Sequence, residues 1–346
     1  MPRCARSGHW CPMAPPSPSA SNPVGRFIKF LLKLAAVLVV IVVVALLALR
    51  GMAALRETQT EAARWGSMVQ TAMGEVYVID YGPKEATPVL LVHGSVGWSA
   101  FWDETIVALE GAGYRAIAFD MPPMGWSERD AAGDYSRVTQ GQRVLALTEA
   151  LDVRPVLVAH SFGAGAGAEA VMAKPQAFAG FIVVDGAIGL EAQPGPPPLP
   201  LRSGPLRQLA VSATITNPWA MKPMLKAFLH KKERAAPYVA TLNAPMKRAG
   251  TTAAMADWLP TLVTRPEGAA SVTQEGWRGL TLPVGILWGV EDTATPLAQG
   301  EQLAALVEGA RLWKLDGLGH IPQIEDPAAF MAALNDALVW VQTQSN

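Results

Sequence analysis

Cysteine and charge are both scarce in this sequence. Cys4 and Cys11 are the only cysteines among 346 residues. The chain beyond residue 11 therefore cannot form a disulfide framework or a cysteine metal site. Charged residues make up only 16% of the chain, and 28 Lys and Arg nearly balance 29 Asp and Glu. Nothing in this charge pattern indicates a nucleic-acid partner. The length allows a sizeable core, in one large domain or two small ones.

One long segment near the start lacks polar side chains. Residues 1–25 are rich in Pro and Ser, which predicts a disordered tail. Residues 26–50 follow and contain an unbroken apolar run at 34–49. Counted from Phe27 to residue 49, the segment forms about 34 Å of helix, enough to cross a bilayer. A cleaved signal peptide is the alternative, but Arg50 follows and no small-residue cleavage site is visible, so we favour a retained transmembrane anchor.

The basic residues around this segment predict its orientation. Five Lys and Arg precede the run, and the three that follow are diluted by two Glu. The bias is small, but it puts the N-terminus in the cytoplasm and the rest of the chain on the non-cytoplasmic side of the membrane.

After the apolar segment, strand patterns alternate with helix patterns. A continuous apolar run that stops at His-Gly predicts a buried strand at 88–94, and alternation of apolar and polar residues predicts a strand at 75–82. Further strands are predicted at 114–120, 155–161, 180–186, 282–289 and 310–317. The alternation predicts an α/β fold, a doubly wound and mostly parallel sheet with helices on both faces. It stops between residues 189 and 280, where segments rich in Leu, Met, Phe and Trp are broken by Pro. We predict a helical insertion there, between core segments 65–188 and 281–343.

A serine stands at the junction of an expected strand and an expected helix. The stretch LVAHSFGAG, residues 157–165, ends an apolar run at Ser161 and continues rich in Gly and Ala. Ala159 and Gly163 are the small residues that a nucleophile elbow, G-x-S-x-G, needs two before and two after its serine. Such an elbow exposes the serine oxygen at a helix N-terminus, where backbone N–H groups favour negative charge. Ser161 is therefore a candidate nucleophile; an ordinary turn with an incidental serine is the alternative.

The order of residues along the chain limits which acid and which histidine could act together with Ser161. In this architecture an acid and then a histidine follow the serine. His320, in the late turn DGLGHIPQ, is well placed to be the general base. Two acids follow expected strands, Asp292 and Asp185. We favour Asp292, which would hold the imidazole tautomer and stabilise the imidazolium.

Two backbone N–H groups are expected to stabilise an oxyanion. Phe162 follows the serine, and Ser95 lies in the loop after the strand at 88–94. His93, beside that loop, is predicted to be structural. His160 is predicted to be a packed residue that faces away from the site.

Several motifs in order resemble the α/β-hydrolase superfamily. They are HGSVG at 93–97, DMPPMGWS at 120–127, the elbow, and GHIPQIEDP at 319–327. Ala159 and Pro123 stand where this family usually has Gly. The resemblance covers about residues 75–342. It implies the α/β-hydrolase fold with a helical lid at 189–280, and hydrolysis through Ser161, Asp292 and His320.

The lid is expected to set the substrate. Trp98, Trp102 and Trp126 fall near the expected strand ends, and Met224 and Phe228 come from the lid. We interpret these five as candidate substrate-binding residues, although such side chains also build ordinary cores. An anchor in the bilayer favours a hydrophobic substrate.

Together these features predict a membrane-anchored serine hydrolase that cleaves a hydrophobic carboxylic ester. The expected partners are that small-molecule ester and membrane lipid around the N-terminal helix; no metal or other cofactor is expected. A C–C bond hydrolase, an amidase or aminopeptidase, and a cofactor-free peroxidase remain open on the same scaffold. An inert anchored binding domain is an alternative of another class.

Overall fold

The computed structural model describes residues 23–60, 66–190 and 195–344. Most of the predicted tail, with Cys4 and Cys11, lies outside the described residues, as does a short part of the predicted insertion, 191–194. Contacts divide the chain into two compact units, Met1–Ala45 and Leu46–Asn346.

The apolar segment forms one helix, α1 (Pro23–Arg56). It begins three residues before the predicted anchor and continues six residues beyond it. By length and composition it is the one helix of the described chain that could cross a membrane, a test that a signal sequence also passes. The last turns of α1, from Leu46, belong to the second unit.

The second unit is built on an eight-stranded sheet of order β1-β2-β4-β3-β5-β6-β7-β8. β2 is antiparallel to both β1 and β4, and all other pairs are parallel. The strands are β1 (Ser67–Thr71), β2 (Gly74–Tyr81), β3 (Pro88–Val92), β4 (Arg115–Phe119), β5 (Val156–His160), β6 (Gly180–Val184), β7 (Val284–Gly289) and β8 (Arg311–Leu315). This confirms the predicted α/β-hydrolase fold. The central strands are continuous apolar runs because helices bury both of their faces.

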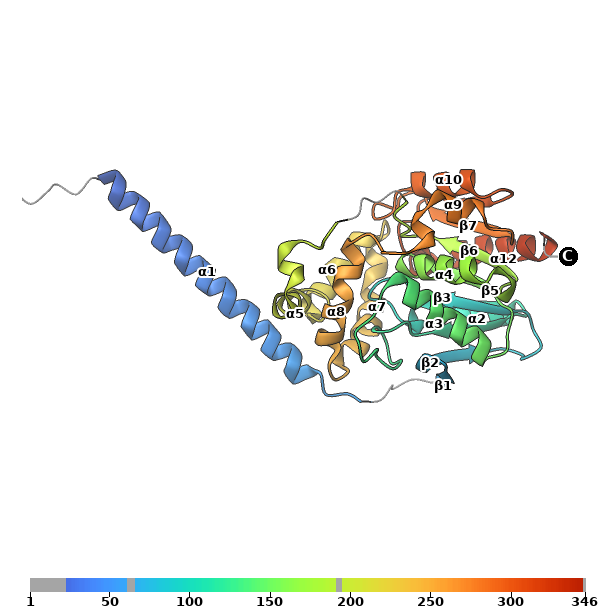
Figure 1. Ribbon diagram of the computed structural model, residues 1–346, viewed down its shortest axis with the longest axis horizontal. Helices are drawn as coiled ribbons and strands as arrows, with labels where there is room; N and C mark the ends of the chain where they lie inside the picture. The colour runs from blue at the N-terminus through green and yellow to red at the C-terminus, as the bar shows by residue number, and fades with distance from the viewer. Residues whose placement is uncertain (1–22, 61–65, 191–194, 345–346) are drawn as a thin grey trace, which may run out of the picture. The chain divides into compact units, whose positions relative to one another are not determined.

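Helices cover both faces of the sheet (Figure 1). One face carries α3 (Arg137–Ala150), α4 (Phe162–Ala173) and α10 (Leu297–Leu306), whose buried residues share one apolar cluster. The other carries α2 (Asp103–Gly111) and α12 (Pro327–Gln344), which share a second cluster. Parallel strands place their carboxyl ends at one edge, so the loops after β3, β5, β7 and β8 converge there.

A helical insertion separates β6 from β7, as the break in the sequence rhythm predicts. Its helices are α5 (Gly204–Ala213), α6 (Pro218–Phe228), α7 (Ala235–Asn243), α8 (Thr251–Val263) and the short α9 (Gln274–Arg278). In Figure 1, α5 to α8 lie together beside the sheet rather than over either face. A further short helix, α11 (Pro322–Glu325), follows β8.

The first strand is the main element that the sequence patterns did not predict. β1 is short and largely exposed, with only Thr71 buried. Its side chains therefore lack the apolar run or strict alternation that marks the other strands. It adds to the sheet only by pairing with β2.

Candidate active site

The turn at Ser161 joins β5 to α4 in an unusual backbone conformation. Ser161 has φ 52° and ψ −122°, a region that residues with side chains rarely adopt. Its N–H donates to the carbonyl oxygen of Val184 at 3.0 Å, and its own carbonyl accepts from the N–H of Ala187 at 3.0 Å. A Cβ atom at Gly163 would collide with the carbonyl oxygen of His93. Close packing of the backbone therefore requires glycine at position 163, two residues after the serine.

His320 lies between Ser161 and Asp292. Its Nε2 is 2.8 Å from the hydroxyl oxygen of Ser161, and its Nδ1 is 2.7 Å from Oδ2 of Asp292. Since a carboxylate only accepts hydrogen bonds, this partner assigns the proton of the neutral ring to Nδ1. Nε2 is then free to accept the hydroxyl proton. The fold brings together three residues that lie far apart in the sequence.

Asp292 is held by the loop that follows it. Its Oδ1 accepts the N–H groups of Ala294 at 2.7 Å and Thr295 at 2.9 Å, and its Oδ2 accepts the Thr295 hydroxyl at 2.6 Å. Burial alone would raise the pKa of Asp292, but hydrogen bonds from His320 and Thr295 outweigh it and hold the pKa below its usual value. The carboxylate is therefore charged and fixed in orientation.

Asp185 occupies a different position from Asp292. It is fully buried at the end of β6, and its Oδ1 accepts the N–H of Gly289 at 2.8 Å. Burial, and then the nearby charge of Asp292, raise the pKa of Asp185 well above its usual value. Asp185 thus keeps its proton more readily than Asp292, and the hydrogen bond to His320 Nδ1 comes from Asp292.

The loop after β3 passes directly against the serine. A Cβ atom at Gly94 would lie 2.9 Å from Cβ of Ser161. His93 fixes this loop: its Nδ1 is 2.9 Å from the Gly94 carbonyl oxygen, and its Nε2 accepts the N–H of Met121 at 2.8 Å. Burial lowers the pKa of His93 to about 4, so the ring is neutral and structural. Phe162, at the start of α4, directly follows Ser161, and Ser95 directly follows Gly94 in this loop.

His160 does not face away from the site, contrary to the expectation from sequence. It is buried as predicted, but its Nε2 lies 2.7 Å from the carbonyl oxygen of His320. Burial lowers its pKa to about 3, so the neutral ring donates this hydrogen bond through Nε2. His160 therefore holds the backbone of His320. The position of His160 directly before Ser161 could have indicated that it belongs to the site. Alternation along a strand instead predicts that neighbouring side chains point to opposite faces of the sheet, and the sequence prediction followed that rule.

Glu325 is a second supporting residue that the sequence reasoning missed. It is almost fully buried, and its carboxylate accepts the N–H of Gly319 at 2.8 Å and the N–H of Lys231. One carboxylate thus ties the loop that carries His320 to the insertion. The motif GHIPQIEDP contains this glutamate, but only the structure gives it a partner in the insertion.

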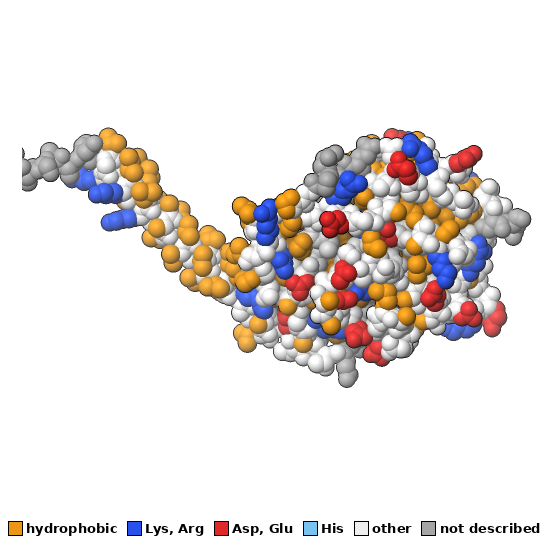
Figure 2. All heavy atoms as spheres, in the orientation of Figure 1, with side chains coloured by type: hydrophobic (Ala, Val, Ile, Leu, Met, Phe, Trp, Pro, Cys, Tyr) orange, Lys and Arg blue, Asp and Glu red, His pale blue; other side chains and the backbone are white. Residues whose placement is uncertain are grey.

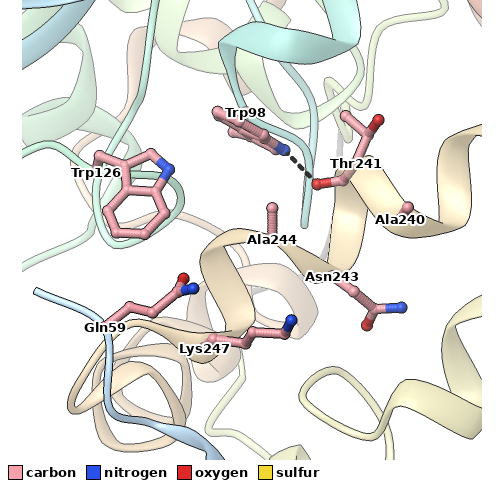
Figure 3. A pocket seen from close by; sticks show the side chains of 8 residues that line it. All are labelled: Gln59, Trp98, Trp126, Ala240, Thr241, Asn243, Ala244 and Lys247. Carbon is pink, nitrogen blue, oxygen red and sulfur yellow. Dashed lines mark hydrogen bonds between the residues drawn. The ribbon is translucent and has the colours of Figure 1, made fainter. Parts of the chain in front are cut away.

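Two of the five predicted substrate-binding residues line a cavity of about 380 Å³ (Figure 3). Trp98 follows β3 and donates its indole N–H to the carbonyl oxygen of Thr241 at 2.8 Å, while Trp126 follows β4. Nε1 of Trp126 is buried and has no hydrogen-bond partner among the described residues. The remaining walls are Gln59, which follows α1, and Ala240, Thr241, Asn243, Ala244 and Lys247 of the insertion.

The other three predicted substrate-binding residues lie elsewhere. Trp102 is fully buried, with its ring 6.2 Å from Phe330 and 6.3 Å from His160, so we assign it to packing. Phe228 ends α6, and its ring centroid is 5.6 Å from that of His320. Its carbonyl oxygen also accepts the N–H of His320 at 3.0 Å. Met224, one turn earlier, is partly buried against the core.

The catalytic candidates are nearly inaccessible in this structure, and Phe228 of the insertion lies against one of them. Ser161 is 6% exposed and His320 is 5% exposed. Among the residues that the structure describes, no group of three or more His, Cys, Asp or Glu side chains could hold a metal ion.

Known proteins are similar to this chain in sequence over most of its length. The pattern of the Alpha/beta hydrolase family matches residues 89–333. An uncharacterized hydrolase of Bacillus subtilis, YugF, is 25% identical over 253 residues, 73% of this chain and 90% of that protein. A 2-hydroxy-6-oxononadienedioate/2-hydroxy-6-oxononatrienedioate hydrolase of Paraburkholderia xenovorans is 28% identical over 268 residues, 73% of this chain and 87% of that protein.

Solved structures agree on the fold. A meta-cleavage product hydrolase, CumD, superimposes with a TM-score of 0.65 over 79% of this chain and 97% of its own, at 22% identity. An esterase from Exiguobacterium antarcticum does so with a TM-score of 0.65 over 80% of this chain and 100% of its own, at 19% identity. With the family pattern spanning most of the sequence, these findings establish that the chain belongs to the α/β hydrolase family.

Proposed function

We propose that this α/β hydrolase is a membrane-anchored serine hydrolase that cleaves a hydrophobic carboxylic ester. The observation that carries the proposal is the continuous chain of contacts from Ser161 through His320 to Asp292, at 2.8 and 2.7 Å. A serine hydroxyl is a weak nucleophile until an oriented base accepts its proton, and this arrangement supplies both the base and its orienting acid.

In the proposed mechanism, the Ser161 oxygen attacks the ester carbonyl carbon while Nε2 of His320 takes the hydroxyl proton. The N–H groups of Ser95 and Phe162 stabilise the oxyanion. The imidazolium, stabilised by Asp292, then gives its proton to the departing alkoxide, which leaves an acyl group on Ser161. Water, deprotonated by His320, attacks this acyl group, and the acid is released.

We propose that the insertion is a lid and that the cavity of Figure 3 receives part of the substrate. Phe228 of α6 lies against the His320 ring, so entry of an ester requires this part of the insertion to move. The two indoles would bury an apolar group. The unpartnered Nε1 of Trp126 and the amine of Lys247 offer hydrogen bonds to its polar end. The apolar helix α1, kept as an anchor, would hold the site near membrane lipids.

A C–C bond hydrolase is the second candidate. The relative from Paraburkholderia xenovorans is named for a dioate, a substrate with two carboxylates, and it aligns with most of this chain. Lys247 is the cation that lines the cavity, and it could pair with such a carboxylate. A neutral ester has no need of this charge, so Lys247→Gln separates the candidates. It should lower kcat/KM for a carboxylate-bearing diketone but hardly change it for a neutral ester.

The test of serine catalysis is covalent labelling. A fluorophosphonate probe should label the full-length protein in detergent at Ser161 and fail to label Ser161→Ala. A panel of p-nitrophenyl esters of increasing acyl length should then give turnover that is lost in the same variant. Persistent labelling of Ser161→Ala would reject the assignment. Absence of labelling and turnover in the folded wild type would instead favour an inert binding domain.

A further inference from the structure

The end of α1 is an integral part of the folded domain. Arg50 donates through Nε to Oε1 of Gln208 in α5 at 3.2 Å, and Arg56 donates through Nη2 to the carbonyl oxygen of Thr216 at 2.9 Å. Ala53, between them, is buried. Because Arg50 directly follows the apolar run, α5 lies within side-chain reach of the point where that run ends.

The first part of the insertion is basic. Residues 195–232 contain six Lys and Arg and no Asp or Glu, in a chain whose formal net charge is −1. Two of the six are paired, Arg207 with Asp257 and Lys231 with Asp326. Lys222 and Lys226 of α6 are exposed. This segment carries a local positive charge that the whole-chain balance hides.

The same segment exposes large apolar side chains. Leu199 is 73% exposed, Leu206 of α5 is 47% exposed and Trp219 of α6 is 68% exposed. Trp219 lies three residues after Thr216, the contact of Arg56. Figure 2 shows orange and blue side chains next to one another where Figure 1 draws the yellow-green start of the insertion. Exposed Trp and Leu among Lys and Arg are typical of a surface that enters a membrane interface.

We propose that α5 and α6 dock on the bilayer, with Leu206 and Trp219 among the lipid headgroups and Lys222 and Lys226 against anionic phosphates. This inference rests on the proposed anchor, because Arg50 can mark headgroup depth only if α1 crosses the membrane. If α5 and α6 dock in this way, the insertion lies at the membrane interface, where hydrophobic esters dissolve. Phe228, which contacts His320, then lies at that interface too.

Single spin labels on the full-length protein test this surface. Because Cys4 and Cys11 are the only cysteines, Cys4→Ser with Cys11→Ser gives a cysteine-free background. Leu206→Cys and Trp219→Cys then report on the proposed surface, with Leu199→Cys in reserve if one fails to fold. Val107→Cys on α2 and Val339→Cys on α12 are controls, since both positions are also exposed but lie outside the insertion. Val40→Cys reports on α1 itself.

In nanodiscs of phosphatidylcholine and phosphatidylglycerol, labels at 206 and 219 should collide more with oxygen and less with a water-soluble nickel chelate than labels at 107 and 339. Lys222→Glu with Lys226→Glu should reduce this difference, while Lys314→Glu on β8 should not. Equal water accessibility at all four positions, with position 40 protected, would overturn the docking proposal but keep the anchor. Water accessibility at position 40 would reject the anchor itself. Dipolar broadening between labels at 219 would mean that a second copy of the chain covers the surface, and would also overturn the proposal.

Discussion

At Ser161 the backbone conformation favours glycine, whereas the proposed chemistry needs a serine hydroxyl. A side chain at φ 52° and ψ −122° costs on the order of 1–3 kcal/mol, and glycine would avoid most of this cost. The surrounding contacts of the turn keep the serine there. The position is thus one where stability and the proposed activity make different demands on the residue.

This conflict gives a prediction for two variants of the same residue. Ser161→Gly should abolish ester turnover and raise the free energy of unfolding by roughly 1–3 kcal/mol. Ser161→Ala should abolish turnover but leave stability nearly unchanged, because its Cβ keeps the strain. Denaturant unfolding of the three proteins measures the difference. Equal stability of the Gly and Ala variants would mean that the turn is not strained.

The two buried acids should respond differently to the same substitution. In Asp292→Asn the amide oxygen should take the place of Oδ1, which accepts two backbone N–H groups, so the NH2 group would face His320 Nδ1. This favours the wrong imidazole tautomer, and kcat should fall on the order of 10⁴-fold. Asp185→Asn keeps an oxygen for the Gly289 N–H and should cost far less. The kcat values of the two variants with the same ester decide which of the two acids orients His320. A dead Asp185→Asn beside an active Asp292→Asn would assign the acid to β6 instead.

His160 gives a pH prediction. The pKa of His160 is about 3 in the folded protein, against 6.5 for an ordinary histidine, because burial disfavours the charged ring. Below pH 6.5 the unfolded chain binds a proton that the folded protein does not, so this residue lowers stability as pH falls, and the effect levels off below pH 3. Relative to His160→Gln, the wild type should lose about 1.4 kcal/mol per pH unit, or roughly 2 kcal/mol between pH 7.5 and 5. Urea unfolding at both pH values measures this; a constant difference would contradict the buried neutral assignment.

At the scale of elements, α6 presents two aromatic side chains in different settings. Phe228 lies against the His320 ring, whereas Trp219 lies at the other end of the helix and is largely exposed. Phe228→Ala should therefore change the preference among acyl chain lengths, while Trp219→Ala should not. The ratio of kcat/KM for short and long p-nitrophenyl esters measures the effect. If Phe228→Ala lowers the unfolding midpoint and leaves that ratio unchanged, Phe228 is a packing residue.

Elements with a strong local pattern could be predicted from sequence, and those defined by distant partners could not. The apolar runs that became β3, β5, β6 and β7 were recognisable because both faces are buried. β1 has no such pattern, since only pairing with β2 makes it a strand. The extra length of α1 was also missed. Its last turns begin after Arg50 and contain Gly51, which is typical of a helix end, and contacts with the insertion, such as Arg56 with Thr216, add to their stability.

The same distinction applies to the candidate site. Ser161, Asp292 and His320 follow strands whose order fixes where their loops meet, so motif spacing was enough to predict that these three side chains lie together. Glu325 and His160 act through contacts with Lys231 and with the backbone of His320, which no spacing encodes. Trp102 has the residue type of a pocket wall, but neighbouring Phe330 and His160 place it in the core.

At the scale of the whole molecule, the segment after α1 connects the end of that helix to the cavity. Glu57 accepts the backbone N–H of Thr252 in α8 at 2.9 Å, and the N–H of Gln59 donates to the carbonyl oxygen of Lys247 at 3.0 Å. Gln59 also forms a wall of the cavity. A truncation that removes all of α1 is therefore expected to disturb the insertion as well as the proposed membrane attachment, and the position of the cut matters.

This leads to a prediction for three forms of the protein. The full chain should sediment with membranes and resist carbonate extraction, because α1 is long and apolar enough to span a bilayer. A form that starts at Leu46 and one that starts at residue 60 should both be soluble. The shorter form loses the contacts of Arg50, Arg56 and Glu57, so it should unfold with about 1 kcal/mol less stability for each hydrogen bond lost. It should also show altered ester selectivity, because Gln59 is gone. Equal stability and selectivity of the two soluble forms would mean that the segment after α1 is only a tether, and a natural soluble chain starting after Arg50 would identify α1 as a signal sequence.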